Sequence, residues 1–294
     1  MHDEFEMSMM GELNFFLGLQ IKQLEDGIFF NQSKYVKEML KKFGLKNSKP
    51  IKTPMSFETK LTRDEDGEPI DDTKYRGMIS SLLYLTANRP DIMFSIYLCA
   101  QFQEELKTSH LEAVERIFIY IKGTSHLGLR YPKGTGLETI IYADFDHAGD
   151  YVDRKSTSGV CTFMGCCLIS WFSKKQTALA ISITETEYVS TEKACQQALW
   201  MKPALVDYDI KLDDIPVLCY NKGAIDLSKN PVLHSRTKHI EIRHHFLRDN
   251  VQKRNITIEK VSFEDNIFGI LTKPLKREPF NLLILGLGLM EPNA

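Results

Sequence analysis

The chain has 294 residues, of which 43% are hydrophobic and 26% are charged. This is the composition of an ordinary globular protein, long enough for one large or two ordinary domains. The formal net charge of -2 excludes a global basic field, so any binding of nucleic acid would need a local basic patch.

A β-hairpin followed by a short helix is predicted first. Two strand-like runs, residues 14–23 and 28–32, flank Glu25-Asp26-Gly27, and Asp-Gly between apolar runs is a strong hairpin signal. Residues 33–44 fit an amphipathic helix, with Ser33 as its N-cap and a glycine just past its end.

A loop and three helices come next. The loop is predicted at residues 46–72, which are polar, rich in proline and aspartate, and without sustained periodicity. Arg89-Pro90 marks one helix boundary and Gly123 another, because the residue before proline disfavours helix and glycine commonly ends one. The predicted helices are residues 75–88, 90–103 and 110–122.

Beyond a break at residues 131–136, strands and helices alternate. The main helix is predicted from about residue 182 to residue 206. Five strands with intervening helices predict an α/β domain built on a mixed sheet. The strand candidates are residues 138–143, 158–164, 168–172, 215–219 and 256–261.

Acidic residues follow the first of these strands. The apolar run Ile140-Ile141-Tyr142-Ala143 leads into Asp144-Phe145-Asp146, and the long helix opens with Glu185 and Glu187. A buried strand cannot carry unpaired acids cheaply, so acids at its tip usually face a cleft, a metal or a cation. Several converging carboxylates are also what two Mg²⁺ ions, about 4 Å apart on a phosphodiester, require.

The cysteines indicate a reducing compartment. They form no Cys-x-x-Cys pair and sit in apolar runs, where free cysteine behaves as a small hydrophobe. With no secretory signal and no apolar run long enough to span a bilayer, we expect an intracellular protein, cytoplasmic or nuclear, without a membrane partner. The six are Cys99, Cys161, Cys166, Cys167, Cys195 and Cys219.

Two basic segments are candidates for contacts with nucleic acid. Residues 234–248 hold four histidines, three arginines and Lys238, and a spacing of four puts His239 and Arg243 on one helix face. The alternative is a solvated basic face, and the histidine spacing does not favour zinc. Lys174 and Lys175 either touch phosphates or form a charged strand end. The predicted contacts are Lys174, Lys175, Arg236, Lys238, His239 and Arg243.

Ordered blocks of sequence lie along nearly the whole chain. Among them are Arg89-Pro90-Asp91-Ile92, Tyr120-Ile121-Lys122-Gly123-Thr124, Arg154-Lys155-Ser156-Thr157-Ser158-Gly159, His234-Ser235-Arg236-Thr237-Lys238-His239 and Leu271-Thr272-Lys273-Pro274-Leu275. Together they resemble the C-terminal part of copia-type LTR retrotransposon Pol polyproteins, and a chance match over so many blocks in the same order is not credible.

The resemblance implies a reverse transcriptase remnant followed by a ribonuclease H-like domain. It implies a palm-edge hairpin at residues 1–32, mainly helical thumb and connection at 33–136, a five-stranded ribonuclease H-like domain at 137–275 and a tail at 276–294. The Tyr-Val-Asp-Asp block of the polymerase site does not occur in the chain, so no polymerase activity is expected.

The ribonuclease H site of the family uses four carboxylates, and this chain retains two of them. Asp144 and Glu187 match the first catalytic aspartate and the helical glutamate. Tyr220 and Gly269 stand where the family has its other two aspartates. Asp146 leaves the same strand tip as Asp144, so it is the candidate replacement ligand. Mg²⁺ or Mn²⁺ is the cofactor of the ancestral site, and the two losses predict poor binding here.

The leading prediction is therefore a Pol fragment without nuclease catalysis. One alternative is a weak metal-dependent ribonuclease H that uses Asp144, Glu187 and Asp146 on RNA–DNA hybrids. Another is a nucleic-acid-binding module that holds a hybrid or RNA through its basic residues. No small-molecule substrate is expected.

Overall fold

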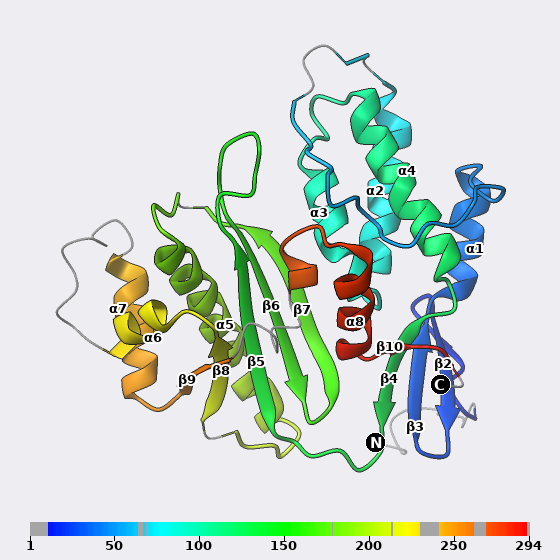
Figure 1. Cartoon of the computed structure of the whole chain (residues 1–294). Helices are drawn as coiled ribbons and strands as arrows, with labels where there is room; N and C mark the ends of the chain where they lie inside the picture. Colours follow the sequence, from blue (N-terminus) through cyan, green and yellow to red (C-terminus); the bar gives the residue numbers. More distant parts are fainter. Residues whose placement is uncertain are drawn as a thin grey trace, which may run out of the picture.

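The computed structural model describes residues 11–63, 67–68, 70–177, 179–212, 214–229, 241–261 and 269–292, without the side chains of 241–244. Two five-stranded sheets lie side by side (Figure 1), and helix α8 (Arg277–Gly286) lies between them. No helix in these ranges is long and apolar enough to cross a membrane. All six cysteines are free, and five of them are buried.

The first sheet joins the two ends of the described chain. The predicted hairpin is confirmed, with Leu24 opposite Gly27 at its turn. The last strand, β10, pairs with β4, so the residues expected to form a tail instead build α8 and complete this sheet. All of its pairs are antiparallel. In spatial order its strands are β1 (Phe15–Phe16), β2 (Leu19–Leu24), β3 (Gly27–Asn31), β4 (Gly128–Pro132) and β10 (Leu289–Met290).

The helices of the first half differ from the predicted ones at their ends. Gln32, not Ser33, is the N-cap of the first helix, because the Ser33 hydroxyl donates to Gln20 Oε1 at 2.7 Å. The second helix begins earlier than predicted, since the Asp71 side chain accepts from the backbone N–H of Thr73. The run after Pro90 splits into a 3-10 turn and a shorter helix. The elements are α1 (Ser33–Lys42), α2 (Asp72–Leu85), η1 (Pro90–Ile92), α3 (Met93–Ala100) and α4 (Thr108–Gly123).

The second sheet confirms the predicted five-stranded mixed sheet and the ribonuclease H-like α/β class. Three strands form an antiparallel meander, and two more run parallel to the first of them. Helix α5 (Ile183–Val206) packs on this sheet, and α6 (Lys222–Lys229) and α7 (Glu241–Gln252) lie beyond it. In spatial order the strands are β7 (Cys167–Lys175), β6 (Thr157–Met164), β5 (Thr139–Asp146), β8 (Ile215–Cys219) and β9 (Ile256–Lys260).

One hydrophobic core spans both halves. Residues of α1 to α4 pack in the same cluster as Cys161, Phe163 and Leu168 of the second sheet and Leu289 of β10. A separate core lies between the second sheet, α5 and α7. Side chains from both sides of the proposed boundary at residues 136/137 therefore pack in one core. A segment cut at this boundary would expose apolar side chains. Experiments on this protein need the full chain.

A buried ion pair holds the helical half together. The Arg89 guanidinium binds both oxygens of Asp91, at 2.8 and 2.7 Å, and the two residues are 2% and 1% exposed. The Tyr120 hydroxyl donates to the same carboxylate at 2.6 Å, and Arg89 also donates to the backbone oxygen of Thr124 at 3.0 Å. This network ties the start of η1 to the end of α4.

Candidate acid cluster

Asp144 lies near the end of β5, which runs on through Asp146 and so extends beyond its predicted end. It is 1% exposed. Its Oδ2 atom accepts a hydrogen bond from the Thr272 hydroxyl and lies 3.9 Å from the Lys273 ammonium. The Ser190 hydroxyl donates to its backbone oxygen at 2.6 Å, which fixes the strand end against α5. The Asp144 carboxylate is therefore hydrogen-bonded to a hydroxyl group and lies near a cation of the same chain.

Glu187 is presented by the first turns of α5. The helix begins after Ser182, whose side chain accepts from the Glu185 backbone N–H, a typical N-cap. The Glu187 Oε1 atom accepts from the backbone N–H groups of Tyr220 and Asn221, at 2.7 and 2.9 Å. Within the described part of the chain, its buried Oε2 atom has no hydrogen-bond partner.

Burial dominates the titration of Glu187. It raises the pKa of this carboxyl to about 7, against the two backbone N–H groups that favour the charged form, and the negative charge of Asp144 adds to the rise. Burial also raises the pKa of Asp146, partly opposed by Lys273 and reinforced by Asp144. Asp146 is two residues beyond Asp144, so both side chains leave the same face of β5.

Two aromatic rings stack on each other near these acids. Phe145 and Tyr220 stack with ring centroids 5.4 Å apart and planes 9° apart. The pKa of the Tyr220 phenol is raised above its ordinary value, first by burial and then by the charges of Glu187, Asp144 and Asp146. The Tyr220 phenol therefore lies close enough to the three acids for their charges to affect its titration.

Gly269 opens the 3-10 turn η4 (Gly269–Leu271), beside the same cluster. A Cβ atom at this position would meet Lys273 Cε at 3.1 Å and, among the residues that the structure describes, no other atom closer than 3.9 Å. Because the close atom belongs to a flexible side chain, the backbone here leaves room for a small side chain. Glycine itself supplies no ligand.

The described residues do not fit a two-metal centre. In the ranges that the structure describes, no group of three or more His, Cys, Asp or Glu side chains could hold a metal ion. The positions of Tyr220 and Gly269 contribute no carboxylate, and Lys273 brings a positive charge to Asp144. Two further acids close to Gly269 in the sequence, Glu264 and Asp265, lie outside the described residues. The donor that best suits a cation is the unpartnered Oε2 atom of Glu187.

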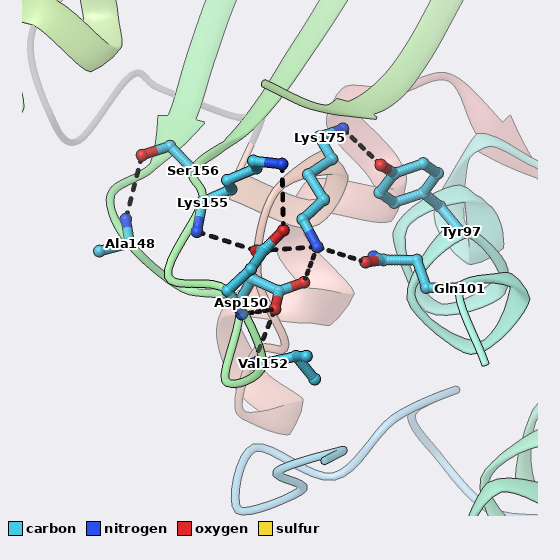
Figure 2. Close-up of polar contacts among 9 residues, drawn as sticks. Tyr97, Gln101, Ala148, Asp150, Val152, Lys155, Ser156 and Lys175 are labelled. Atoms are coloured by element: carbon cyan, nitrogen blue, oxygen red, sulfur yellow. Dashed lines mark hydrogen bonds and ion pairs between the residues drawn. The ribbon is translucent and has the colours of Figure 1, made fainter. Parts of the chain in front are cut away.

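The two adjacent lysines of β7 have different surroundings. Lys174 is exposed. The Lys175 ammonium binds Asp150 Oδ2 at 2.7 Å, Asp153 Oδ1 at 2.9 Å and Gln101 Oε1 at 2.9 Å (Figure 2). Its backbone N–H donates to the Tyr97 hydroxyl at 2.6 Å (Figure 2).

These contacts join the second sheet to the residues of α3 and just beyond it. Burial alone would lower the pKa of Lys175, but its hydrogen bonds with Asp150 and Asp153 outweigh burial and raise it. Asp150 is 6% exposed, so this ion pair is largely buried on the carboxylate side. The geometry favours a structural role for Lys175, and its contact with phosphate stays a prediction.

The remaining basic candidates are not tested by the structure. Arg236, Lys238 and His239 lie outside the described residues, and Arg243 lies in α7 without a described side chain. Sequence reasoning missed the roles of Thr272 and Lys273 at Asp144. Their block of sequence was noted, but no local pattern indicated that it would meet β5.

Comparisons with known proteins agree over most of the chain. Residues 1–57 match the family described as reverse transcriptase (RNA-dependent DNA polymerase). The chain is 38% identical to the retrovirus-related Pol polyprotein from transposon RE1 of Arabidopsis thaliana, over 92% of this chain and 18% of that protein. It is 33% identical to that from transposon TNT 1-94 of Nicotiana tabacum, over 95% of this chain and 22% of that protein.

A shorter relative is matched over most of its own length. An uncharacterized mitochondrial protein of Arabidopsis thaliana is 34% identical, over 67% of this chain and 81% of that protein. The chain spans about a fifth of the length of the Pol polyproteins that it matches. Among solved structures, RNase H1 from Halobacterium salinarum is similar with a TM-score of 0.33 and 14% identity, over 46% of this chain and 93% of that one.

Proposed function

The chain belongs to the copia-type family of retrovirus-related Pol polyproteins of transposons, and from this premise we propose that it is a Pol segment whose ribonuclease H site is catalytically inactive. In this proposal the first half derives from the end of a reverse transcriptase, and the second half from the ribonuclease H domain that follows it. The ancestral substrate is the RNA strand of an RNA–DNA hybrid.

The observation that carries the proposal is the set of groups around Asp144. Where the family needs two further carboxylates, this chain has a phenol stacked on Phe145 and a glycine next to the Lys273 ammonium. Mg²⁺ demands near-octahedral oxygen ligands and tolerates poor geometry badly. A phenol supplies neither the charge nor the hard oxygen donor that a carboxylate does. Losing several members of a cooperative site removes most of the rate.

Restoring the missing carboxylates in the full chain tests this proposal. The variant carries Tyr220→Asp and Gly269→Asp, with Phe145→Ala to remove the ring that would otherwise lose its stacking partner. Position 269 accepts a side chain if Lys273 moves slightly. We expect Mg²⁺-dependent cleavage of a labelled RNA–DNA hybrid by the restored variant and none by the wild type.

The matched control adds Asp144→Asn to the restored variant, which should abolish the recovered cleavage. Cleavage by the wild type, lost in Asp144→Asn, would contradict the proposal. A restored variant that folds but stays inactive would show that more than these positions has decayed. Folding of each variant is checked by circular dichroism and a urea unfolding curve.

A second candidate function is weak metal-dependent hydrolysis of RNA in hybrids. The unpartnered Oε2 atom of buried Glu187 favours it, because buried carboxylate oxygens are normally hydrogen-bonded or bound to a cation. In that case Asp144, Glu187 and Asp146 would share one ion. Cleavage by the wild type in Mn²⁺, lost in Glu187→Gln as well as in Asp144→Asn, would support this candidate.

A further inference from the structure

Two adjacent cysteines lie in the hairpin that joins β6 to β7. Met164 pairs with Cys167, so Gly165 and Cys166 form a two-residue turn between the strands. Of these two, only Gly165 has a positive φ, of +57°, which is typical of a type II′ turn with glycine at its first central position. The hairpin therefore places Cys166 in the turn and Cys167 at the start of β7.

The turn is anchored to the segment that leads into β5. The backbone N–H of Gly165 donates to the backbone oxygen of Glu138 at 2.8 Å. A Cβ atom on Gly165 would lie 2.5 Å from the backbone oxygen of Gly136, so glycine is needed for this close approach. The Cys167 Sγ atom lies 3.9 Å from the Thr135 hydroxyl oxygen. Because the turn is already held in place, the cysteine pair needs little ordering to bind a ligand.

The two thiols are in contact, and one of them is open to solvent. The Cys166 and Cys167 side chains are hydrogen-bonded to each other. Cys166 is exposed and Cys167 is 7% exposed, whereas the other four cysteines are each 0% exposed. Burial raises the pKa of the Cys167 thiol, and the neighbouring Cys166 adds to this rise, against a hydrogen bond with Thr135. Cys167 is therefore a neutral thiol at neutral pH.

A direct disulfide does not suit this pair. The peptide bond between Cys166 and Cys167 is trans, which places their Cα atoms about 3.8 Å apart. Disulfides usually join Cα atoms about 4.4–6.8 Å apart, and a poorly fitting disulfide is strained and easily reduced. An atom that bridges the two sulfurs lengthens the ring that the side chains close, so it relieves this strain.

The pair also lacks the partners of a typical metal site. In the part of the chain that the structure describes, no group of three or more His, Cys, Asp or Glu side chains could hold a metal ion, and structural zinc takes four ligands. Thiolates select soft centres. Trivalent arsenic holds two sulfurs at nearly a right angle and therefore close together, whereas linear coordination by an ion such as Cu(I) spreads them apart. Thiols in hydrogen-bond contact fit the narrow arrangement.

We propose that Cys166 and Cys167 form a dithiol site that captures a trivalent arsenical, R–As(OH)₂. The exposed Cys166 thiol displaces the first hydroxide: an S–As bond forms, an As–O bond breaks, and the thiol proton leaves with the hydroxide as water. The Cys167 thiol displaces the second hydroxide in the same way. Arsenic stays trivalent, so no oxidant or reductant takes part. The inference goes beyond the proposed function, because neither cysteine belongs to the acid cluster.

Titration of the reduced full chain with phenylarsine oxide tests the proposal. In water this compound is the hydrated arsenical with a phenyl group as R. Mass spectrometry of the intact chain should show saturation at one phenylarsenic group per chain. Dithiothreitol, a dithiol, should remove the arsenic, whereas glutathione at the same concentration of thiol groups should not, because one thiol cannot replace a chelate.

Serine variants separate the two thiols. Because two linked contacts bind about 10²–10⁴-fold more tightly than one, Cys166→Ser and Cys167→Ser should each weaken binding by a factor in this range. Cys161→Ala is the matched control, since Cys161 lies in β6 of the same hairpin but is 0% exposed, and it should bind as the wild type does. Circular dichroism checks the folding of each variant, and Cys166→Ser changes only an exposed turn position.

Three results of these titrations would overturn the proposal. They are equal binding by Cys166→Ser and the wild type, release of arsenic by glutathione as readily as by dithiothreitol, and loss of binding in Cys161→Ala.

Oxidised glutathione tests the argument against a direct disulfide. Attack by Cys166 should release one glutathione and leave the other as a mixed disulfide on this residue. Conversion of the pair to a Cys166–Cys167 disulfide would instead assign it to redox chemistry and overturn the proposal. Failure of the nuclease tests leaves all of these results unaffected, because they use neither Mg²⁺ nor a hybrid.

Discussion

Two buried clusters of charged side chains illustrate different ways of keeping a carboxylate inside this protein. In the helical half, Asp91 receives both arms of the Arg89 guanidinium and the Tyr120 hydroxyl. In the second half, Asp144 receives the Thr272 hydroxyl and lies 3.9 Å from the Lys273 ammonium, while one oxygen of Glu187 has no hydrogen bond among the described residues. The first cluster is matched in charge, and the second is rich in acid.

The difference indicates that the two clusters were shaped by different requirements. A bidentate arginine pair with its remaining hydrogen bonds satisfied is a complete structural unit. An acid cluster with an unpartnered buried oxygen is poorly matched to folding alone, because a buried polar atom without a hydrogen-bond partner costs free energy. This agrees with our proposal that the acid cluster derives from a cation site that has lost some of its ligands.

The largest effect is expected from breaking the complete cluster. Arg89→Met leaves Asp91 buried without its cation, which should lower the free energy of unfolding by about 3–5 kcal/mol in urea denaturation. Arg76→Met is the matched control, because Arg76 pairs with Asp72 at the surface, and it should cost less than about 1 kcal/mol. Equal losses would contradict the structural role of the buried pair.

The contribution of the acid cluster to the free energy of unfolding should depend on pH. Glu187 has its pKa raised from 4.5 to about 7 in the folded chain, so the folded state holds this proton more tightly than the unfolded state. The stability it contributes is complete below about pH 4.5 and is lost as the pH rises through 7, by up to about 3 kcal/mol.

The variant Glu187→Gln tests the predicted loss of stability with rising pH. The neutral amide oxygen can still accept from Tyr220 and Asn221, so the variant should be more stable than the wild type at pH 8 and nearly equal to it at pH 4. Urea unfolding across this range measures the difference. A difference that stays constant with pH would show that Glu187 is not the group responsible.

The aromatic pair within the acid cluster should give a smaller effect. In a double-mutant cycle of Phe145→Leu and Tyr220→Leu, the coupling energy should be about 0.5–1.5 kcal/mol, as for other stacked rings. Additive single effects would mean that the two rings are only neighbours. A measurable coupling would show that the two rings stabilise each other.

The smallest effect is expected from metal itself. Replacing EDTA by about 10 mM Mg²⁺ should change the free energy of unfolding of the wild type by less than about 0.5 kcal/mol, because a weakly bound ligand stabilises little. The variant with Phe145→Ala, Tyr220→Asp and Gly269→Asp should gain more. A larger gain in the free energy of unfolding of the wild type would show that its acid cluster still binds Mg²⁺.

The parts of the fold that follow local patterns were predictable. Alternating apolar runs predicted the strands of the second sheet, and the Ser182 cap preceded the helix that carries Glu187. Asp26-Gly27 predicted the hairpin. In each case the residues that determine the element lie within one element or one turn of each other. The local sequence is therefore enough to predict that element.

The contacts that escaped prediction join distant positions. The sequence marks Arg89 as a helix boundary and as part of a family block, but it does not indicate the polar network around the residue. Thr124, which accepts from Arg89, and Tyr120, which donates to Asp91, lie a full helix away. Lys175 is bound by Gln101 and Asp150, and period-two alternation alone does not say which acids will face a strand residue. The stack of Phe145 on Tyr220 likewise requires knowing that the ends of β5 and β8 are adjacent.

The pairing of β10 with β4 has a consequence for biosynthesis. Leu289 bonds opposite Leu129, so the first sheet cannot be completed until the ribosome has made almost every described residue. Until then the edge of β4 that pairs with β10 stays unpaired. An unpaired strand edge promotes aggregation or binding by chaperones. A premature stop codon shortly before residue 289 would therefore produce a truncated chain with an exposed strand edge. The quality-control machinery of the cell would treat this chain as incompletely folded.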